Sequence, residues 1–201
     1  MAHVGGRHPG CSCIRGLALH LLLAAAFILQ LAGTTAQAQG MGDETVVARR
    51  VKAAYLYRFT AYVQWPPPAF ASADSPLVIG VLGNDLLAED LATLVAGRTF
   101  DGRRFEVRKL RRTDALAGLH ILYLRQDSTS QLSHVLSGLP PLGTLLITDS
   151  PGALAHGSAI NFLLVDEQVR FELSLEAAEK FGLKLSSRLV NVSHNLSGKG
   201  R

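Results

Sequence analysis

Apolar and polar residues alternate most regularly near the C-terminal end of the chain, in Ile160–Val165 and again in Val169–Leu175. A period of two residues is typical of a half-buried β-strand. The polar segment 166–168 between the two runs is short, so we predict an antiparallel hairpin. Because this segment contains no Asn-Gly or Asp-Gly pair, we expect a loop slightly longer than the tightest hairpin turns.

The spacing of apolar residues changes to that of a helix directly after the hairpin. Ser174 can cap the first turn, and apolar residues recur on one face as far as Phe181. Gly182 is placed to end this helix in a left-handed conformation. The segment Leu185–Val192 follows, and its pattern favours a second short helix, although a strand also fits it.

The pattern of Thr45–Gln64 predicts a long helix. Its apolar arc is wide enough to pack on more than one surface. Two interpretations remain open: burial within the domain, or an additional surface for self-association or for a partner. The run Trp65-Pro66-Pro67-Pro68 ends the helix, because proline cannot continue it. The principal face contains Val47, Val51, Tyr55, Phe59 and Tyr62.

Strands and helices alternate through the middle of the chain. The predicted strands are Leu77–Leu82, Arg104–Leu110, His120–Leu124 and Thr144–Thr148, and the predicted helical segments are Asp85–Val95, Thr113–Ala117 and Ser128–Leu136. Such alternation is typical of a parallel or mixed sheet between helices. We therefore predict an α/β fold: a single three-layer domain at 45–195, with a mixed, mostly parallel sheet flanked by helices and a C-terminal antiparallel hairpin. Residues 39–44 and 196–201 are expected to be a flexible leader and a flexible tail.

Residues 1–38 have the pattern of a secretory signal peptide. Arg7 and Arg15 precede the apolar run Leu17–Ala32, and Ala36-Gln37-Ala38 is a small-x-small cleavage site. A membrane anchor is the alternative, but the apolar run is shorter than the roughly 20 residues of a spanning helix. We expect cleavage after Ala38 and a periplasmic protein that does not itself span the membrane.

Removal of this segment changes the composition. It holds two of the 20 Lys and Arg residues and none of the 16 acids, so the net charge falls from +4 to +2. Both cysteines, Cys11 and Cys13, are lost with it, and the remaining chain must be held together by its core. The basic residues of 103–112 lack aromatic companions for base stacking, so we predict no nucleic-acid partner.

A search for catalytic motifs gives a negative result. Gly80 and Gly83 follow a predicted strand but do not complete a dinucleotide fingerprint, and neither a phosphate-binding loop nor a GxSxG turn occurs. The four histidines beyond residue 38 do not have metal-ligand spacing, and His120 is expected to be structural. We predict no catalytic residue, no cofactor and no metal, and hence no enzyme.

Two stretches distinguish the chain from a generic α/β domain. VKAAYLYRFTAYVQWP (Val51–Pro66) and the stretch Ile160–Val190 resemble the opening and closing motifs of the YfiR family. The middle of the chain, including LVIGVLG and GRTFDGRRFEVRKL, is similar to that family too, so the resemblance covers about 46–192. The chain departs from the family pattern at Gly157-Ser158, where members often have two glycines, and in having no cysteine in the mature domain.

The resemblance implies a function in signalling. Members of the family are periplasmic α/β proteins, and the best understood of them restrains an inner-membrane diguanylate cyclase through the periplasmic sensor portion of the cyclase. It therefore implies a non-enzymatic periplasmic regulatory binding protein, acting on such a cyclase or on another membrane signalling protein in cyclic di-GMP signalling. It brings no catalytic residue and, without cysteines, no redox control. A small-solute or transporter-accessory binding module is the alternative.

The partner surface is expected on the N-terminal helix, because its apolar arc is wider than one contact requires. Tyr57, Arg58 and Trp65 are the candidate partner-binding residues, since aromatic and arginine side chains are frequent interface hot spots. The competing interpretation is that Tyr57 and Trp65 fill the core. The same helix is the candidate surface for a homodimer.

Overall fold

The computed structural model describes residues 2, 44–125 and 129–197. Apart from residue 2, the predicted signal peptide lies outside this part of the chain, as do residues 39–43 of the predicted leader and the last four residues. The strands are β1 (Val63–Gln64), β2 (Leu77–Leu82), β3 (Thr99–Phe100), β4 (Arg103–Leu110), β5 (Ile121–Leu124), β6 (Leu145–Thr148), β7 (Ile160–Val165), β8 (Gln168–Ser174), β9 (Lys184–Leu185) and β10 (Asn195–Ser197). The α-helices are α2 (Val46–Phe59), α3 (Asp85–Val95), α4 (Thr129–Gly138), α5 (Leu175–Lys180) and α6 (Ser187–Val192), and the 3₁₀-helices are η1 (Thr60–Tyr62), η2 (Pro67–Ala69) and η3 (Ala153–His156).

Most of these strands form one mixed sheet, in the order β10-β8-β7-β6-β5-β2-β4-β3. The central strands from β4 to β7 are parallel, whereas β8 pairs with β7 in antiparallel fashion and β3 pairs with β4 in the same way. The strands β1 and β9 form a separate antiparallel pair. The predicted fold class, including the C-terminal hairpin, is confirmed.

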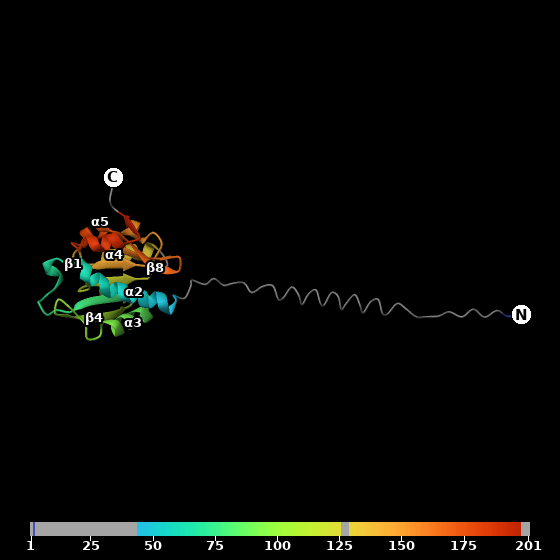
Figure 1. Cartoon of the computed structure of the whole chain (residues 1–201), viewed down its shortest axis with the longest axis horizontal. Coiled ribbons are helices and arrows are strands. Elements are labelled where there is room, and N and C mark those ends of the chain that lie inside the picture. Colours follow the sequence, from blue (N-terminus) through green and yellow to red (C-terminus); the bar gives the residue numbers. More distant parts are fainter. Residues whose placement is uncertain (1, 3–43, 126–128, 198–201) are drawn as a thin grey trace. The chain divides into compact units, whose positions relative to one another are not determined.

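Helices cover both faces of the sheet, which gives three layers. Figure 1 shows α2 lying across the strands with α3 beside it. The core on that face contains alternate residues of the central strands, such as Ile79 and Tyr123, while their neighbours Val78 and Leu122 belong to a second core that contains α4 residues. The strands β2, β5 and β6 are buried along their whole length, as expected for parallel strands covered on both sides.

The N-terminal helix packs on the hairpin through aromatic rings. The ring centroid of Phe59 lies 6.0 Å from that of Phe162 in β7 and 5.1 Å from that of Phe171 in β8. Tyr55, one turn earlier, lies 5.4 Å from Phe171. Aromatic pairs in such offset and edge-on arrangements add about 0.5–1.5 kcal/mol each beyond burial. The N-terminal helix is thus fixed on the hairpin by the packing of aromatic rings.

The predicted helix Thr45–Gln64 is too long at its C-terminal end. The α-helix stops at Phe59, a 3₁₀ turn follows, and Val63 and Gln64 pair with Leu185 and Lys184 of β9. Pairing with a strand distant in sequence thus replaces the last helical turn. At the other end the prediction holds, because the Thr45 hydroxyl accepts a hydrogen bond from the backbone N–H of Ala48.

The hairpin turn is tighter than predicted. Val165 pairs with Gln168, so the loop has only two residues, Asp166 and Glu167. Both adopt left-handed backbone angles, with φ of 48° and 60°. Positive φ at both positions is the requirement of a type I′ turn, which is usually met by Asn-Gly. Here the aromatic packing of the two strands fixes their register. Two non-glycine residues therefore adopt the strained conformation that this register requires of the turn.

Other boundaries also differ from prediction. Thr113–Ala117 forms turns and no helix. The ambiguous segment resolves into the short strand β9 and the helix α6, which is capped by Ser186. The domain extends beyond 195, because β10 pairs in parallel with β8 as far as Ser197. It also begins earlier than 45, since Glu44 makes buried polar contacts that are described below.

Candidate functional site

Two of the three predicted partner-binding residues lie near the C-terminal end of α2. Tyr57 is half-buried, and its ring contacts that of Phe105 in β4 edge-on, with the centroids 5.5 Å apart. The guanidinium group of Arg98 lies 5.1 Å from the centroid of the Tyr57 ring, which is a cation–π distance. Arg58 is exposed beside Tyr57. The structure therefore holds Tyr57 in place and leaves Arg58 accessible.

A groove of about 260 Å³ runs between the end of α2 and the β3–β4 hairpin. We call it the α2–β3 groove. It is rich in aromatic side chains, and both Tyr57 and Arg58 belong to its wall. Its lining residues are Tyr57, Arg58, Thr60, Ala61, Tyr62, Thr99, Phe100 and Phe105.

A second hollow of about 390 Å³ adjoins this groove on the α3 side and shares Thr99 and Phe105 with it. Arg98 and Arg104 line the second hollow. Among the described residues, no side-chain carboxylate oxygen lies within 4.0 Å of a guanidinium nitrogen of Arg58, Arg98 or Arg104. The joint surface thus combines aromatic rings with three arginines that have no ion pair within the described domain. This combination fits an acidic partner segment.

Trp65 does not line the groove. Its indole ring packs edge-on against Phe70 and Phe100, with centroids 6.3 Å and 5.7 Å away. The indole N–H donates a hydrogen bond to the backbone oxygen of His120, at 3.3 Å. Trp65 therefore supports Phe100, one wall of the groove, from behind. The structure brings Tyr57 and Arg58 together and assigns Trp65 a packing role.

The imidazole of His120 is held as a neutral group. Its Nδ1 accepts a hydrogen bond from the backbone N–H of Val78 at 3.0 Å, and Nε2 lies 3.0 Å from the carbonyl oxygen of Ala69, to which its proton can be donated. The ring stacks on Phe70 with centroids 4.2 Å apart. Burial lowers the pKa of His120 below its ordinary value. These contacts give His120 a structural role.

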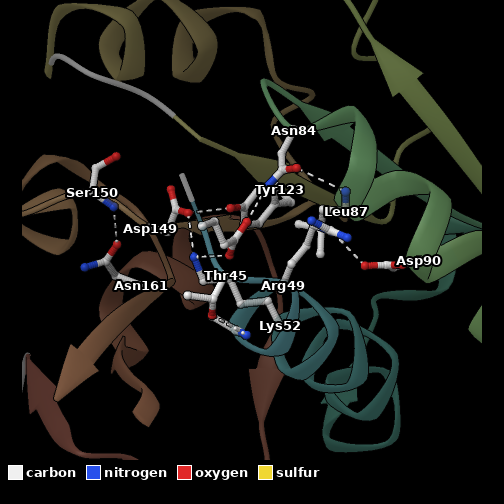
Figure 2. Close-up of polar contacts among 12 residues, drawn as sticks. Thr45, Arg49, Lys52, Asn84, Leu87, Asp90, Tyr123, Asp149, Ser150 and Asn161 are labelled. Atoms are coloured by element: carbon white, nitrogen blue, oxygen red, sulfur yellow. Dashed lines mark hydrogen bonds and ion pairs between the residues drawn. The ribbon is translucent and has the colours of Figure 1, made fainter. Parts of the chain in front are cut away.

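A buried polar cluster lies at the carboxyl ends of β2, β5 and β6 (Figure 2). The Lys52 ammonium group of α2 lies 2.7 Å from Glu44 Oε1 and 2.8 Å from Asp149 Oδ2. The Tyr123 hydroxyl donates to the same Asp149 oxygen at 2.5 Å. Burial, followed by the charge of Asp149, raises the pKa of Tyr123 well above its usual range, so this hydroxyl remains a donor.

Asn84 connects this cluster to α3. Its amide N–H donates to Glu44 Oε2 at 2.6 Å, and its side-chain oxygen accepts from the backbone N–H of Leu87 at 3.0 Å (Figure 2). One asparagine therefore caps α3 and anchors Glu44, which lies directly before Thr45, the N-cap residue of α2. Asp149 Oδ1 is buried without a hydrogen-bond partner in the described structure. The role of the cluster is to fix the N-terminal end of α2 on the sheet.

Sequence reasoning missed this cluster. It placed Glu44 in the leader and gave Asp149 no part in a site. The signal in the sequence was an acid directly after a predicted buried strand. In the structure the nearby polar residues Ser150 and Asn161 are buried as well. Asn161 accepts hydrogen bonds from Thr148 and from the backbone N–H of Ser150. Among the described residues no group of histidines, cysteines and acids could hold a metal ion.

Comparison with protein families gives a match between residues 49–194 and the model of the YfiR/HmsC-like family. The chain belongs to that family. The match covers both stretches on which the sequence resemblance rested. Membership in the YfiR/HmsC-like family suggests a periplasmic regulator of diguanylate cyclases. No described helix is long and apolar enough to cross a membrane.

A solved structure shows the same fold. It is a conserved domain protein from Vibrio cholerae O1 biovar El Tor, with 11% sequence identity and a TM-score of 0.50. The alignment covers 74% of this chain and 60% of that one. At this identity the likeness concerns the fold alone. No curated protein matches the sequence.

Proposed function

We propose that this protein is a non-enzymatic periplasmic regulator that restrains an inner-membrane diguanylate cyclase by binding the periplasmic sensor portion of the cyclase. Membership in the YfiR/HmsC-like family over residues 49–194 carries the proposal. The family is regulatory rather than catalytic, and this supports a binding function. Tyr57 and Arg58 in the α2–β3 groove are the proposed partner-binding residues, with Trp65 acting behind them through Phe100.

Restraint of an enzyme requires unequal binding. A regulator shifts the conformational equilibrium of its partner toward the inactive state only if it binds the inactive conformation more tightly than the active one. The α2–β3 groove supports such selectivity because its walls come from three elements, α2, η1 and the β3–β4 hairpin, so its shape is fixed by the fold. Arg58, Arg98 and Arg104 favour a partner conformation that presents acidic side chains at matching positions.

The test is a complementation experiment. Deletion of the gene is expected to raise cyclic di-GMP, and expression of the wild-type chain is expected to restore the original level. Arg58→Glu is expected to fail, because it reverses the charge at the groove. Arg50→Glu is the matched control: Arg50 is also exposed on α2 but does not line the groove, so this variant is expected to restore the level.

Three additional measurements make the result specific. Thermal unfolding and periplasmic abundance of both variants are expected to match those of the wild type, because both arginines are exposed. An acid-to-arginine substitution in the partner is expected to rescue Arg58→Glu selectively. If deletion does not change cyclic di-GMP under conditions in which the protein is expressed, the cyclase role is wrong. The alternative function, a small-solute or transporter-accessory binding module, then remains.

A further inference from the structure

The order of the strands creates a crevice between β2 and β5. After β2 the chain enters α3, on the same face of the sheet as α2, and continues to β4. After β5 it enters α4, whose residues belong to the core on the opposite face, and continues to β6. The two connections therefore leave neighbouring parallel strands in opposite directions. In open α/β sheets, ligands bind outside the carboxyl ends of the strands at such a switch point.

The crevice is present as a cavity of about 290 Å³. Its walls come from the ends of both strands, from the segment after β4 and from α4. We call it the switch-point crevice. Its lining residues are Leu82, Gly83, Arg112, Leu124, Arg125, His134 and Val135.

Backbone contacts fix the base of the crevice. The backbone N–H of Arg125 donates to the carbonyl oxygen of Leu82 at 3.0 Å, which ties the end of β5 to that of β2. Gly83 has φ of +85°, and a Cβ atom there would lie 2.6 Å from the carbonyl oxygen of Arg125. Glycine is therefore required for this close approach. The cavity depends on a backbone arrangement that most side chains would prevent.

The lining has two chemical parts. Leu82, Leu124 and Val135 provide an apolar base and are at most 8% exposed. Arg125 brings a positive charge. Arg112, which has a further contact within the chain, brings a second one, and the imidazole of exposed His134 adds a polar group. No carboxylate belongs to the described lining residues. An apolar base beneath cationic groups is suited to a small molecule with one anionic group and a short apolar body.

We propose that the switch-point crevice binds a small carboxylate with a short apolar chain. A guanidinium group matches a carboxylate in planar, two-pronged geometry, and charge-assisted hydrogen bonds of this type are the strong ones. The volume is at the lower end of the range of about 300–1,000 Å³ for ligand sites, which limits the ligand to a small molecule. None of the lining residues belongs to the α2–β3 groove, so this inference does not depend on the regulatory role.

Calorimetric titration of protein expressed from the full-length sequence tests the proposal. The probe is hexanoate, with acetate as the probe without a chain and hexylammonium as the probe of opposite charge. Saturable binding of hexanoate is expected, with affinity for acetate and hexylammonium weaker by about tenfold or more, since each lacks one of the two recognised parts. NMR shift changes are expected at the amides of Gly83, Arg125 and Val135.

Charge reversal distinguishes recognition from nonspecific apolar binding. Arg112→Glu and Arg125→Glu are each expected to weaken hexanoate binding by about tenfold or more and to strengthen hexylammonium binding. Arg111→Glu is the matched control, because it changes the neighbouring residue, which does not line the crevice. A gain for hexylammonium cannot arise from misfolding. Absence of saturable hexanoate binding, equal binding of hexylammonium by the wild type, or equal effects of all three substitutions would each overturn the proposal.

Discussion

Lys52 is the cation shared by the two carboxylates buried at the end of the sheet, Glu44 and Asp149. Its ammonium group contacts two carboxylates whose side chains are each only 8% exposed, and its own side chain is 13% exposed. Charges removed from water are costly unless they are paired, and loss of one partner leaves the others without compensation. The cluster is thus weak evidence for added stability, but it is sensitive to substitution.

We predict that Lys52→Met destabilises the protein by about 3–5 kcal/mol, because Glu44 and Asp149 then lose their shared cation in a buried site. Chemical denaturation measures the change. Lys180→Met is the control: its pair with Glu176 is 67% exposed on both sides, so about 0–1 kcal/mol is expected. Equal effects of the two substitutions would mean that the cluster is hydrated and not buried.

Phe171 tests the assignment of the buried face of the hairpin. It is 2% exposed and packs on Tyr55 and Phe59. Phe171→Asp is expected to destabilise the protein by at least about 4 kcal/mol, because it removes a core ring and buries an unpaired charge. Leu164→Asp on the same hairpin, at a position 68% exposed, is expected to change stability by less than about 0.5 kcal/mol. Melting of Phe171→Asp within a few degrees of the wild type would show the assignment to be wrong.

At the residue scale, the sequence predicted side chains whose surroundings are local. The cap at Ser174 and the left-handed Gly182 follow from short patterns, and both are present. The contact between Lys52 and Asp149 joins residues 97 positions apart in the sequence, and no local pattern predicts it. The different positions of Tyr57 and Trp65 depend likewise on where the β3–β4 hairpin packs. Both residues are aromatic, so residue type alone could not predict that Tyr57 lines the groove whereas Trp65 packs behind it.

At the scale of elements, the buried parallel strands were the most predictable part. A run such as LVIGVL allows few other structures, and β2 has the predicted bounds. The errors lie where one element depends on another. The end of α2 is set by pairing with β9, and β10 forms because the edge of β8 is available to it. Boundaries of this kind depend on tertiary partners rather than on propensity.

The turn between β7 and β8 offers a stabilising substitution. Left-handed backbone angles cost a non-glycine residue roughly 1–2 kcal/mol, and both loop residues have them. Replacing Asp166 and Glu167 with Asn and Gly is expected to raise the free energy of unfolding by about 0.5–1 kcal/mol, after the added flexibility of glycine in the unfolded chain is counted. The urea midpoint gives the change. Glu167→Ala keeps the unfavourable backbone angle and is expected to bring no gain.

At the scale of the whole molecule, the two proposed sites occupy different parts of one sheet. The α2–β3 groove lies beside the edge strand β3, and the switch-point crevice lies at the central pair β2 and β5. Sequence reasoning could predict the alternation that produces a parallel sheet. It could not locate either hollow, because strand order decides which loops meet, and that order depends on contacts between distant segments.

Export is the prediction that concerns the entire chain. Mass spectrometry of the periplasmic fraction is expected to find a protein that begins at Gln39, since Ala36 and Ala38 supply the small residues of the cleavage site. Ala38→Leu is expected to accumulate the uncleaved precursor, whereas Gln37→Leu is expected to be processed normally, because the middle position of the site is not restricted to small residues. A full-length cytoplasmic protein would contradict export. It would also remove the regulatory proposal, since only an exported chain can reach the periplasmic portion of a membrane enzyme.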